Sequence, residues 1–229
     1  MCRGKYIAFC DGDDFWNDAH KLKKQVEFLK TNENYIGVAT NGILFNELSN
    51  EKKHHYGRDN KQYFSKYDLL NGNPFLTSSV IYKANIVKNF SNQLIDLNAP
   101  AGDYHMHVYA SQFGLIGFLS DLSTTYRIHN SGIWQNKTPS QSLDSAIIVA
   151  KSINKKILKD FYSKWLIKKY IGRLYGKLGS HLVFQGKYLK AFYVSLLSIS
   201  YPLPSFKYRF KIFKQIIFII FKIFFKRNR

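Results

Sequence analysis

The chain has very little cysteine and no visible secretory signal. Only Cys2 and Cys10 occur among 229 residues, too few for a disulfide framework, so we expect a reducing, cytoplasmic setting. At the start, Met1-Cys2-Arg3 leads almost directly into an apolar run rather than into a basic segment and a long hydrophobic stretch. A disulfide-stapled secreted domain is therefore excluded as the starting hypothesis.

Long apolar runs are also missing. In the tail, residues 206–229, the longest uncharged run is Gln215–Phe221, seven residues, whereas a bilayer-spanning helix needs roughly 20. Five lysines nevertheless fall on one helical stripe and Phe and Ile fill the rest: Lys207, Lys211, Lys214, Lys222 and Lys226. This pattern predicts a basic amphipathic helix over 205–229 lying on an anionic membrane surface, with a docking helix for another subunit as the alternative.

Acidic residues are absent from the last part of the chain. Lys and Arg total 34 against 15 Asp and Glu, a net charge of +19, and no acidic residue follows Asp160. Residues 161–229 carry 15 Lys and Arg, a balance that favours an anionic partner, either lipid headgroups or nucleic acid. Because the basic residues interleave with Phe and Ile and no aromatic RNA-binding signature occurs, we expect lipid and no nucleic acid.

What remains is ample material for a core, with 45% hydrophobic and 17% aromatic residues. Residues 18–31 predict a helix that packs Leu22, Val26 and Leu29 on a sheet and turns Lys21, Lys23 and Lys24 to other faces. Strands are expected over 35–46, 75–82 and 122–128, a polar loop over 51–62, and short helices over 64–70 and 84–90. Longer helices are expected over 142–162 and 165–183, so we divide the chain into residues 1–140, 141–204 and 205–229.

Three carboxylates stand close together after a predicted buried strand, Tyr6–Cys10. Asp11, Asp13 and Asp14 lie within four positions and repel one another unless a cation lies among them. Mg²⁺ and Mn²⁺ prefer such oxygen ligands. The alternative is a polar turn in which Asp14 or Asn17 caps the following helix. The spacing alone leaves both interpretations open.

Two longer blocks resemble the sugar-nucleotide-dependent glycosyltransferases of family 2. They are GKYIAFCDGDDFW at 4–16, followed by KLKKQVEFLKTN at 21–32, and GDYHMHVYASQFGLIGFLSDLSTTYRIHNSGIW at 102–134. The resemblance covers roughly residues 4–135, in the size range of a compact domain. It implies an α/β fold of GT-A type, a mixed sheet with flanking helices, followed here by an α-helical C-terminal region.

The resemblance also implies roles for individual residues. Asp11 and Asp13 would hold a divalent metal, Mg or Mn, on the diphosphate of a nucleotide-sugar donor. Asp103 would be the general base that deprotonates the acceptor, giving inversion at the anomeric carbon; a helix N-cap is its structural alternative. Thr77, Ser78 and Ser79 would line the donor-sugar pocket, or else serve as ordinary strand residues.

The segment after the last predicted strand carries three more candidates. In relatives a Tyr-Arg-x-His sequence, a glycine-containing loop and a Trp close over the donor, which implies substrate-binding roles for Arg127, His129 and Trp134. His129 could also complete the metal shell. Arg127 as a structural ion-pair partner and Trp134 as a core residue are the alternatives. The pair His54-His55, in a polar run, is expected to be solvated rather than metal-binding.

The resemblance is incomplete, because family members begin with a nucleotide-binding half-sheet that has no counterpart before Tyr6. We therefore expect the isolated chain to turn over little sugar nucleotide, as a fragment, a mis-started frame or a remnant. The implied function is transfer of a sugar to a lipid-linked or polysaccharide acceptor in bacterial surface glycan synthesis, on the inner face of the cell membrane. A non-catalytic, membrane-associated remnant is the rival. A haloacid-dehalogenase phosphatase is disfavoured, because Phe15 stands close to where those enzymes want Thr or Val.

Overall fold

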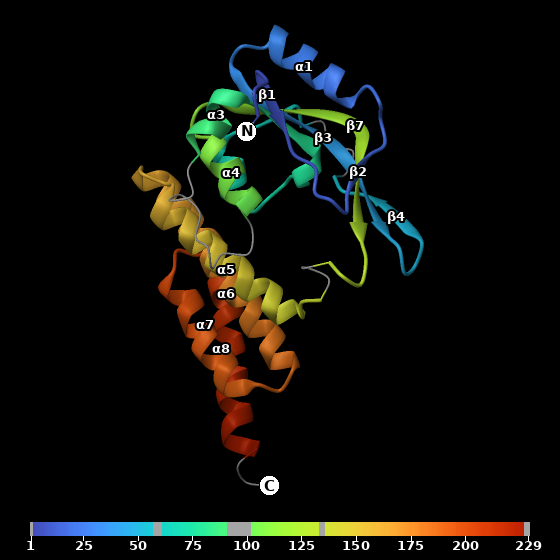
Figure 1. Ribbon diagram of the computed structural model, residues 1–229. Coiled ribbons are helices and arrows are strands. Elements are labelled where there is room, and N and C mark those ends of the chain that lie inside the picture. Colours follow the sequence, from blue (N-terminus) through green and yellow to red (C-terminus); the bar gives the residue numbers. More distant parts are fainter. Residues whose placement is uncertain (1, 57–60, 91–101, 133–135, 227–229) are drawn as a thin grey trace. The chain divides into compact units, whose positions relative to one another are not determined.

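The computed structural model describes residues 2–56, 61–90, 102–132 and 136–226 (Figure 1). The chain divides into two compact units, which are considered separately. The sheet unit comprises Met1–Leu94 and Gly102–Asn136, and the helical unit comprises Ile95–Ala101 and Lys137–Arg229.

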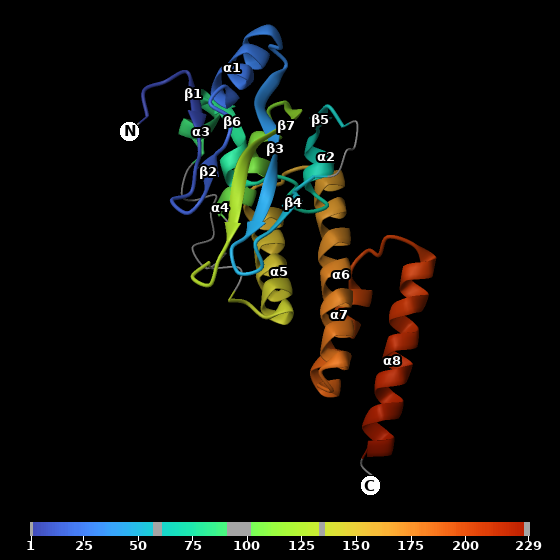
Figure 2. The ribbon, with the colours of Figure 1, turned by 90° about the vertical axis from the view of Figure 1, so that its right-hand side faces the viewer.

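The sheet unit is built on a mixed, seven-stranded sheet. Its main path runs β1 (Tyr6–Ala8), β6 (Val80–Lys83), β3 (Tyr35–Asn46), β7 (Leu115–Ile128) and β2 (Phe15–Trp16). Off this path, β4 (Glu51–His54) pairs with β3 and β5 (Tyr63–Phe64) pairs with β7. The two longest strands, β3 and β7, run parallel side by side, and the other described pairs are antiparallel (Figure 2).

Short helices connect and cover these strands. They are α1 (Lys21–Thr31), α2 (Lys66–Leu69), the 3₁₀ turn η1 (Thr77–Ser79), α3 (Ala84–Asn89) and α4 (Gly102–Ala110). The core between α1 and the sheet is formed by Leu29, Val38 and Ile81, all essentially buried. A second core region is aromatic, with ring centroids 4.8 Å apart for Phe64 and Phe75 and 5.7 Å apart for Phe64 and Phe118.

Several sequence predictions are confirmed and several are corrected. The strand over 35–46 and the helix beginning at Ala84 form as predicted. The strand predicted over 75–82 is instead η1 followed by β6, the predicted loop over 51–62 contains β4, and β7 begins at Leu115 rather than Leu122. The first strand ends at Ala8, so Cys10 is exposed rather than buried.

The buried stripe of α1 is also different from the predicted one. Leu22 is exposed, whereas Lys21 and Gln25 are 1% and 0% exposed. Lys21 Nζ donates to Gln25 Oε1 (2.8 Å) and lies 4.8 Å from the Trp16 ring centroid, and burial lowers its pKa to about 8. The Gln25 amide in turn donates to two backbone carbonyls of the sheet region. Polar groups are tolerated inside because they are paired there.

The helical unit consists of α5 (Pro139–Lys156), α6 (Phe161–Phe184), α7 (Tyr188–Ser200) and α8 (Phe206–Lys226). Each end-to-end connection is short, and α5 packs on α6, α7 on α6, and α8 on α7 (Figure 2). Two helices start at side-chain caps, Thr138 for α5 and Asp160 for α6, as expected for oxygen-bearing residues at this position. No helix in the described part of the chain is long and apolar enough to cross a membrane.

Glycines on α6 allow its neighbours to approach closely. A Cβ at Gly176 would lie 2.6 Å from Tyr208 Oη and 2.8 Å from Ile212 Cδ1, both on α8. One turn further, a Cβ at Gly179 would meet Gln215 and Ser195 at 2.6 Å. The close approach of α8 to α6 therefore depends on glycine, which has no side chain, at positions 176 and 179.

We predict that Gly176→Ala destabilises the helical unit by about 1–3 kcal/mol, because the added methyl overlaps α8 in an already filled space. Lys177→Ala, on the exposed side of the same helix, is the matched control and should change the free energy of unfolding by less than about 0.5 kcal/mol. Denaturant unfolding of both variants measures the difference. Equal stability of the two would contradict the close packing of α8 on Gly176.

Candidate functional site

The three clustered aspartates lie in a tight turn between β1 and β2. The Asp14 amide donates to the Asp11 carbonyl (3.1 Å), which closes the turn. The Asp14 carboxylate accepts from Ser78 Oγ of η1 (3.0 Å) and from the Arg127 backbone amide of β7 (3.2 Å). Burial raises the pKa of Asp14, although both hydrogen bonds favour its charged form. Asp14 thus joins the turn to two segments that are distant in sequence.

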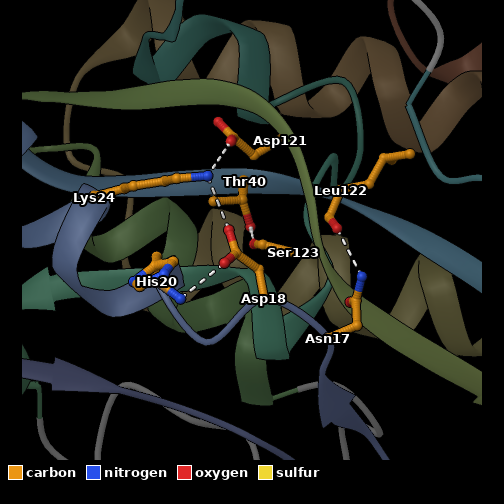
Figure 3. Close-up of polar contacts among 8 residues, drawn as sticks. All are labelled: Asn17, Asp18, His20, Lys24, Thr40, Asp121, Leu122 and Ser123. Carbon is orange, nitrogen blue, oxygen red and sulfur yellow. Dashed lines mark hydrogen bonds and ion pairs between the residues drawn. The ribbon is translucent and has the colours of Figure 1, made fainter.

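The residues that follow the turn are fixed to β7 as well (Figure 3). Asn17 Nδ2 donates to the Leu122 carbonyl (2.7 Å), and Lys24 Nζ pairs with both Asp18 (2.9 Å) and Asp121 (2.6 Å). On the same strand, Ser123 Oγ donates to Thr40 Oγ1 at 2.7 Å.

These contacts decide one alternative left open by the sequence. The residue preceding α1 is His20, and no side chain caps the helix there. The Asn17 amide is used by β7 and the Asp14 carboxylate by η1 and β7. The interpretation of Asp14 or Asn17 as the cap of α1 is therefore wrong.

Asp103 lies in the first turn of α4 and faces the same turn. Its Oδ2 accepts from Asn73 Nδ2 (2.9 Å) and from Thr77 Oγ1 (3.4 Å). Thr77 is also close to the Asp11 carboxylate, whose charged form it favours. Partial burial raises the pKa of Asp11, and the nearby negative charges of Asp103 and Asp13 raise it further. The fold therefore brings Asp11 and Asp103 together around Thr77.

Asp13 is held on the other side of the turn by His129. Their Oδ2 and Nε2 atoms are 3.1 Å apart, and the side chains are 49% and 19% exposed. The hydrogen bond from His129 lowers the pKa of Asp13. The pKa values of Asp11 and Asp13 are thus shifted in opposite directions, although only Gly12 separates the two residues.

Arg127 lies near these carboxylates, but its guanidinium interacts mainly with Glu47, ahead of Asp13 and Asp14. Its Nε pairs with Glu47 Oε1 at 2.6 Å, and its contact with the aspartate turn is made by the backbone amide. This geometry favours the structural ion-pair interpretation of Arg127. Trp134, the third candidate of this segment, lies outside the described residues.

The remaining sequence candidates each make different contacts. Ser78 and Ser79 are in η1 rather than in a strand; Ser78 bonds to Asp14, while Ser79 Oγ donates to the Leu76 carbonyl. His55 Nε2 lies 3.1 Å from the Pro74 carbonyl, and burial lowers its pKa, whereas His54 is exposed in β4. The two histidines do not form a ligand pair.

The aspartate turn offers few protein ligands to a divalent metal. Among the described residues, no group of three or more His, Cys, Asp or Glu side chains is arranged to hold a metal ion. Mg²⁺ is commonly bound by one or two carboxylates together with substrate phosphates and water. The pair Asp11 and Asp13 fits a metal of that kind, with His129 available only after it leaves Asp13.

Sequence reasoning missed two residues of the site. Asn73 was assigned no role, yet it donates to Asp103. Glu47 was assigned no role, yet it holds Arg127. The first contact joins residues 30 positions apart and the second joins residues 80 positions apart. A single sequence gives no signal for such pairing.

His107 supports α4 from inside, one helical turn after Asp103. It is 2% exposed, and its Nδ1 lies 2.6 Å from the Tyr82 hydroxyl of β6. Its Nε2 has no hydrogen-bond partner among the described residues. Burial lowers the pKa of His107 to about 4, against the opposing effect of Asp103. The imidazole is therefore neutral near pH 7.

Part of the chain is similar in sequence to known proteins. Residues 1–89 match the family model of glycosyl transferase family 2. Uncharacterized proteins of Mycobacterium bovis and Mycobacterium tuberculosis are 30% identical over 138 residues, which is 58% of this chain and 38% of each relative. The chain thus spans well under half the length of these curated relatives.

Solved structures show the same fold. S. aureus TarS in complex with UDP superposes with a TM-score of 0.52 at 14% identity, covering 100% of this chain and 68% of that one. TarS in complex with UDP-GlcNAc gives 0.51 at 13% identity, covering 86% and 60%. The chain therefore contains a family 2 glycosyltransferase-like domain. Its α/β fold is of GT-A type, with a mixed sheet and flanking helices followed by the C-terminal helices, as predicted.

We predict that Asp14→Ala destabilises the sheet unit by about 1–3 kcal/mol, because Ser78 Oγ and the Arg127 amide lose their shared acceptor. Asp13→Ala, which removes a more exposed carboxylate of the same turn, is the control and should cost less. Denaturant unfolding measures both. A larger loss for Asp13→Ala than for Asp14→Ala would refute the bracing role of Asp14.

A second prediction concerns stability at acidic pH. In the unfolded chain His107 takes up a proton below about pH 6.5, whereas in the folded chain it does so only near pH 4. The free energy of unfolding should therefore fall as the pH drops through this window, and His107 should account for about 2 kcal/mol of the fall at pH 5. Denaturant unfolding at pH 7 and pH 5, compared with His107→Gln, isolates this contribution.

His54→Gln controls for the removal of a histidine, because His54 is exposed in β4. An identical loss of stability between pH 7 and pH 5 in the chain and in His107→Gln would show that His107 is not responsible.

Proposed function

We propose that the sheet unit is the catalytic part of an inverting glycosyltransferase that uses a nucleotide-sugar donor. The observation that carries the proposal is the convergence of Asp11, Asp13 and Asp103 at one turn, where Thr77 donates to Asp103 and where burial and the charges of Asp103 and Asp13 raise the pKa of Asp11. Like-charged groups packed in this way are typical of sites that bind cations and of acid–base sites. The family match and the TarS complexes with UDP and UDP-GlcNAc support a nucleotide-sugar donor.

In this proposal the carboxylates divide the work. A Mg²⁺ or Mn²⁺ ion held by Asp11 and Asp13, when bound, supplies positive charge for the diphosphate that leaves with the nucleotide. Asp103 takes the proton of the acceptor hydroxyl as that oxygen attacks the anomeric carbon. Asn73 and Thr77 both donate to Oδ2 of Asp103, so we assign Oδ1 to the acceptor proton.

His129 and its neighbours have a supporting part. His129 holds Asp13 in place and is the candidate third ligand or diphosphate contact. Arg127 acts through Glu47 and through its backbone amide, while stacking of Trp134 on the sugar stays a prediction. We further propose a lipid-linked or polysaccharide acceptor in bacterial surface glycan synthesis, and a peripheral place on the inner face of the cell membrane.

Two isosteric variants test the division of roles. Asp13→Asn should weaken binding of Mn²⁺ with UDP by more than about tenfold, because one anionic metal ligand is lost. Asp103→Asn should leave that binding within about twofold and lower the rate of sugar transfer, which we expect to be small in the unmodified chain, by about 10²–10⁴-fold, since it removes the base. Calorimetry measures binding, and an assay against a panel of sugar nucleotides measures transfer.

Asp18→Asn is the control, because Asp18 pairs with Lys24 outside the turn. The proposal fails if Mn²⁺ and UDP do not bind together to the unmodified chain. It also fails if Asp103→Asn abolishes binding as strongly as Asp13→Asn does, since Asp103 would then be a ligand and not the base.

A further inference from the structure

Helix α8 presents three distinct faces in the folded helical unit. Ile212, Ile216 and Ile219 are buried against the neighbouring helices. A second set of apolar side chains, which we call the outer apolar face, recurs every three or four residues on another side of the helix: Phe206, Phe210, Phe213, Ile217, Ile220 and Phe224. Most apolar residues of α8 are thus shared between a packed face and an outer face, while Phe218 and Phe221, which are also exposed, lie toward the lysines.

The outer apolar face is strongly exposed. Phe206 is 85% exposed, Phe213 55% and Phe224 68%. At 3.6 residues per turn, these three lie along one line of the helix and about a sixth to two fifths of a turn from the buried isoleucines. Exposed apolar surface of this extent indicates an interaction site.

Lysines flank this face on one side only. Lys207, Lys211, Lys214 and Lys222, which we call the lysine stripe, are exposed and lie between the outer apolar face and the packed face. Lys214 Nζ is 4.6 Å from the Phe210 ring centroid, so the cations border the aromatic rings directly. Lys222 also lines an open hollow with Lys187 and Lys190 of the neighbouring chain segment.

Charge and geometry together select the partner. No acidic residue follows Asp160, so every charged side chain of α8 is cationic. An apolar face bordered by lysines is the arrangement of helices that lie in the headgroup region of anionic bilayers, with rings among the acyl chains and ammonium groups at the phosphates. A protein partner would need an acidic rim around an apolar groove, and a second copy of α6, α7 or α8 could not supply it, because none of these helices contains an acidic residue.

We propose that the helical unit binds anionic phospholipid bilayers as a folded body. The outer apolar face enters the bilayer surface, the lysine stripe contacts lipid phosphates, and the isoleucine face stays packed. This inference rests on the proposed function only in so far as a lipid-linked acceptor would lie in the same surface. It names the face of α8 that binds and the lipid charge that it selects.

Sedimentation of the full chain with vesicles tests this directly, in the absence of donor and acceptor. Vesicles of phosphatidylcholine with phosphatidylglycerol should bind the chain at least about tenfold more tightly than vesicles of phosphatidylcholine alone. Added salt should release it, because the lysine contacts are screened. Equal binding to both kinds of vesicle, or none to either, would overturn the proposal.

Two sets of variants separate the apolar and the cationic contributions. The triple change Phe210→Ser, Phe213→Ser and Phe224→Ser should weaken binding by at least about tenfold. The double change Phe161→Ser and Phe184→Ser, which removes even more exposed rings of α6, should have little effect. Changing Lys207, Lys211 and Lys214 to Gln should abolish the preference for phosphatidylglycerol, whereas Lys52→Gln with Lys53→Gln in β4 should not.

Thermal unfolding and light scattering of the same variants exclude other causes. All the altered side chains are exposed, so the midpoint of unfolding should be retained. If the triple variant changes the oligomeric state of the chain but not its vesicle binding, the outer apolar face joins two copies of the chain and the proposal is wrong. Because no sugar transfer is measured, failure here leaves the proposed function of the sheet unit to its own test.

Discussion

The shared hydrogen bonds of the Asp14 carboxylate hold the candidate site together. Strand β2 pairs with β7 through Phe15 with Thr125 and Trp16 with Thr124, which brings Asp14 beside the amide of Arg127. The carboxylate accepts hydrogen bonds from that amide and from the hydroxyl of Ser78 at the same time. Thr77, which precedes Ser78 in η1, donates to Asp103. The contact between Asp14 and Ser78 therefore also helps to set the position of the proposed base.

This arrangement concentrates negative charge in a strongly basic chain. Asp11, Asp13 and Asp14 lie in one turn that Asp103 faces, where Arg127 is already paired with Glu47 and His129 hydrogen-bonds to Asp13. Hydrogen bonds from Ser78, Thr77 and Asn73 offset part of the repulsion, but they add no positive charge. A bound cation, or protonation of a carboxylate, would remove the remaining repulsion. The proposed sugar transfer needs the same two features, a cation at this turn and a carboxylate that takes up a proton.

The sequence was most informative where one segment decides its own structure. The apolar, β-branched run 35–46 forms β3, and the clustered aspartates do lie at one turn. It was misleading where distant residues decide. Lys21 and Gln25 are buried because Trp16 and backbone carbonyls pair with them. Strand β7 continues through the polar pair Ser120-Asp121 because its register against β3 shifts there, from Leu119 opposite Thr40 to Leu122 opposite Asn41. Asn73 reaches Asp103 only through the fold.

Helix α8 shows a limit of a different kind, because its composition has two possible structural meanings. A helix this rich in Phe and Ile can be a core helix or an interfacial helix, and periodicity alone does not separate them. The structure assigns Ile212, Ile216 and Ile219 to the core, where Gly176 and Gly179 of α6 leave room for α8 to approach. Because these isoleucines pack on one side of α8, Phe206, Phe213 and Phe224 lie on a second side. The lysine stripe occupies the third side. A helix with two apolar faces needs two apolar environments, and the helical unit provides only one of them.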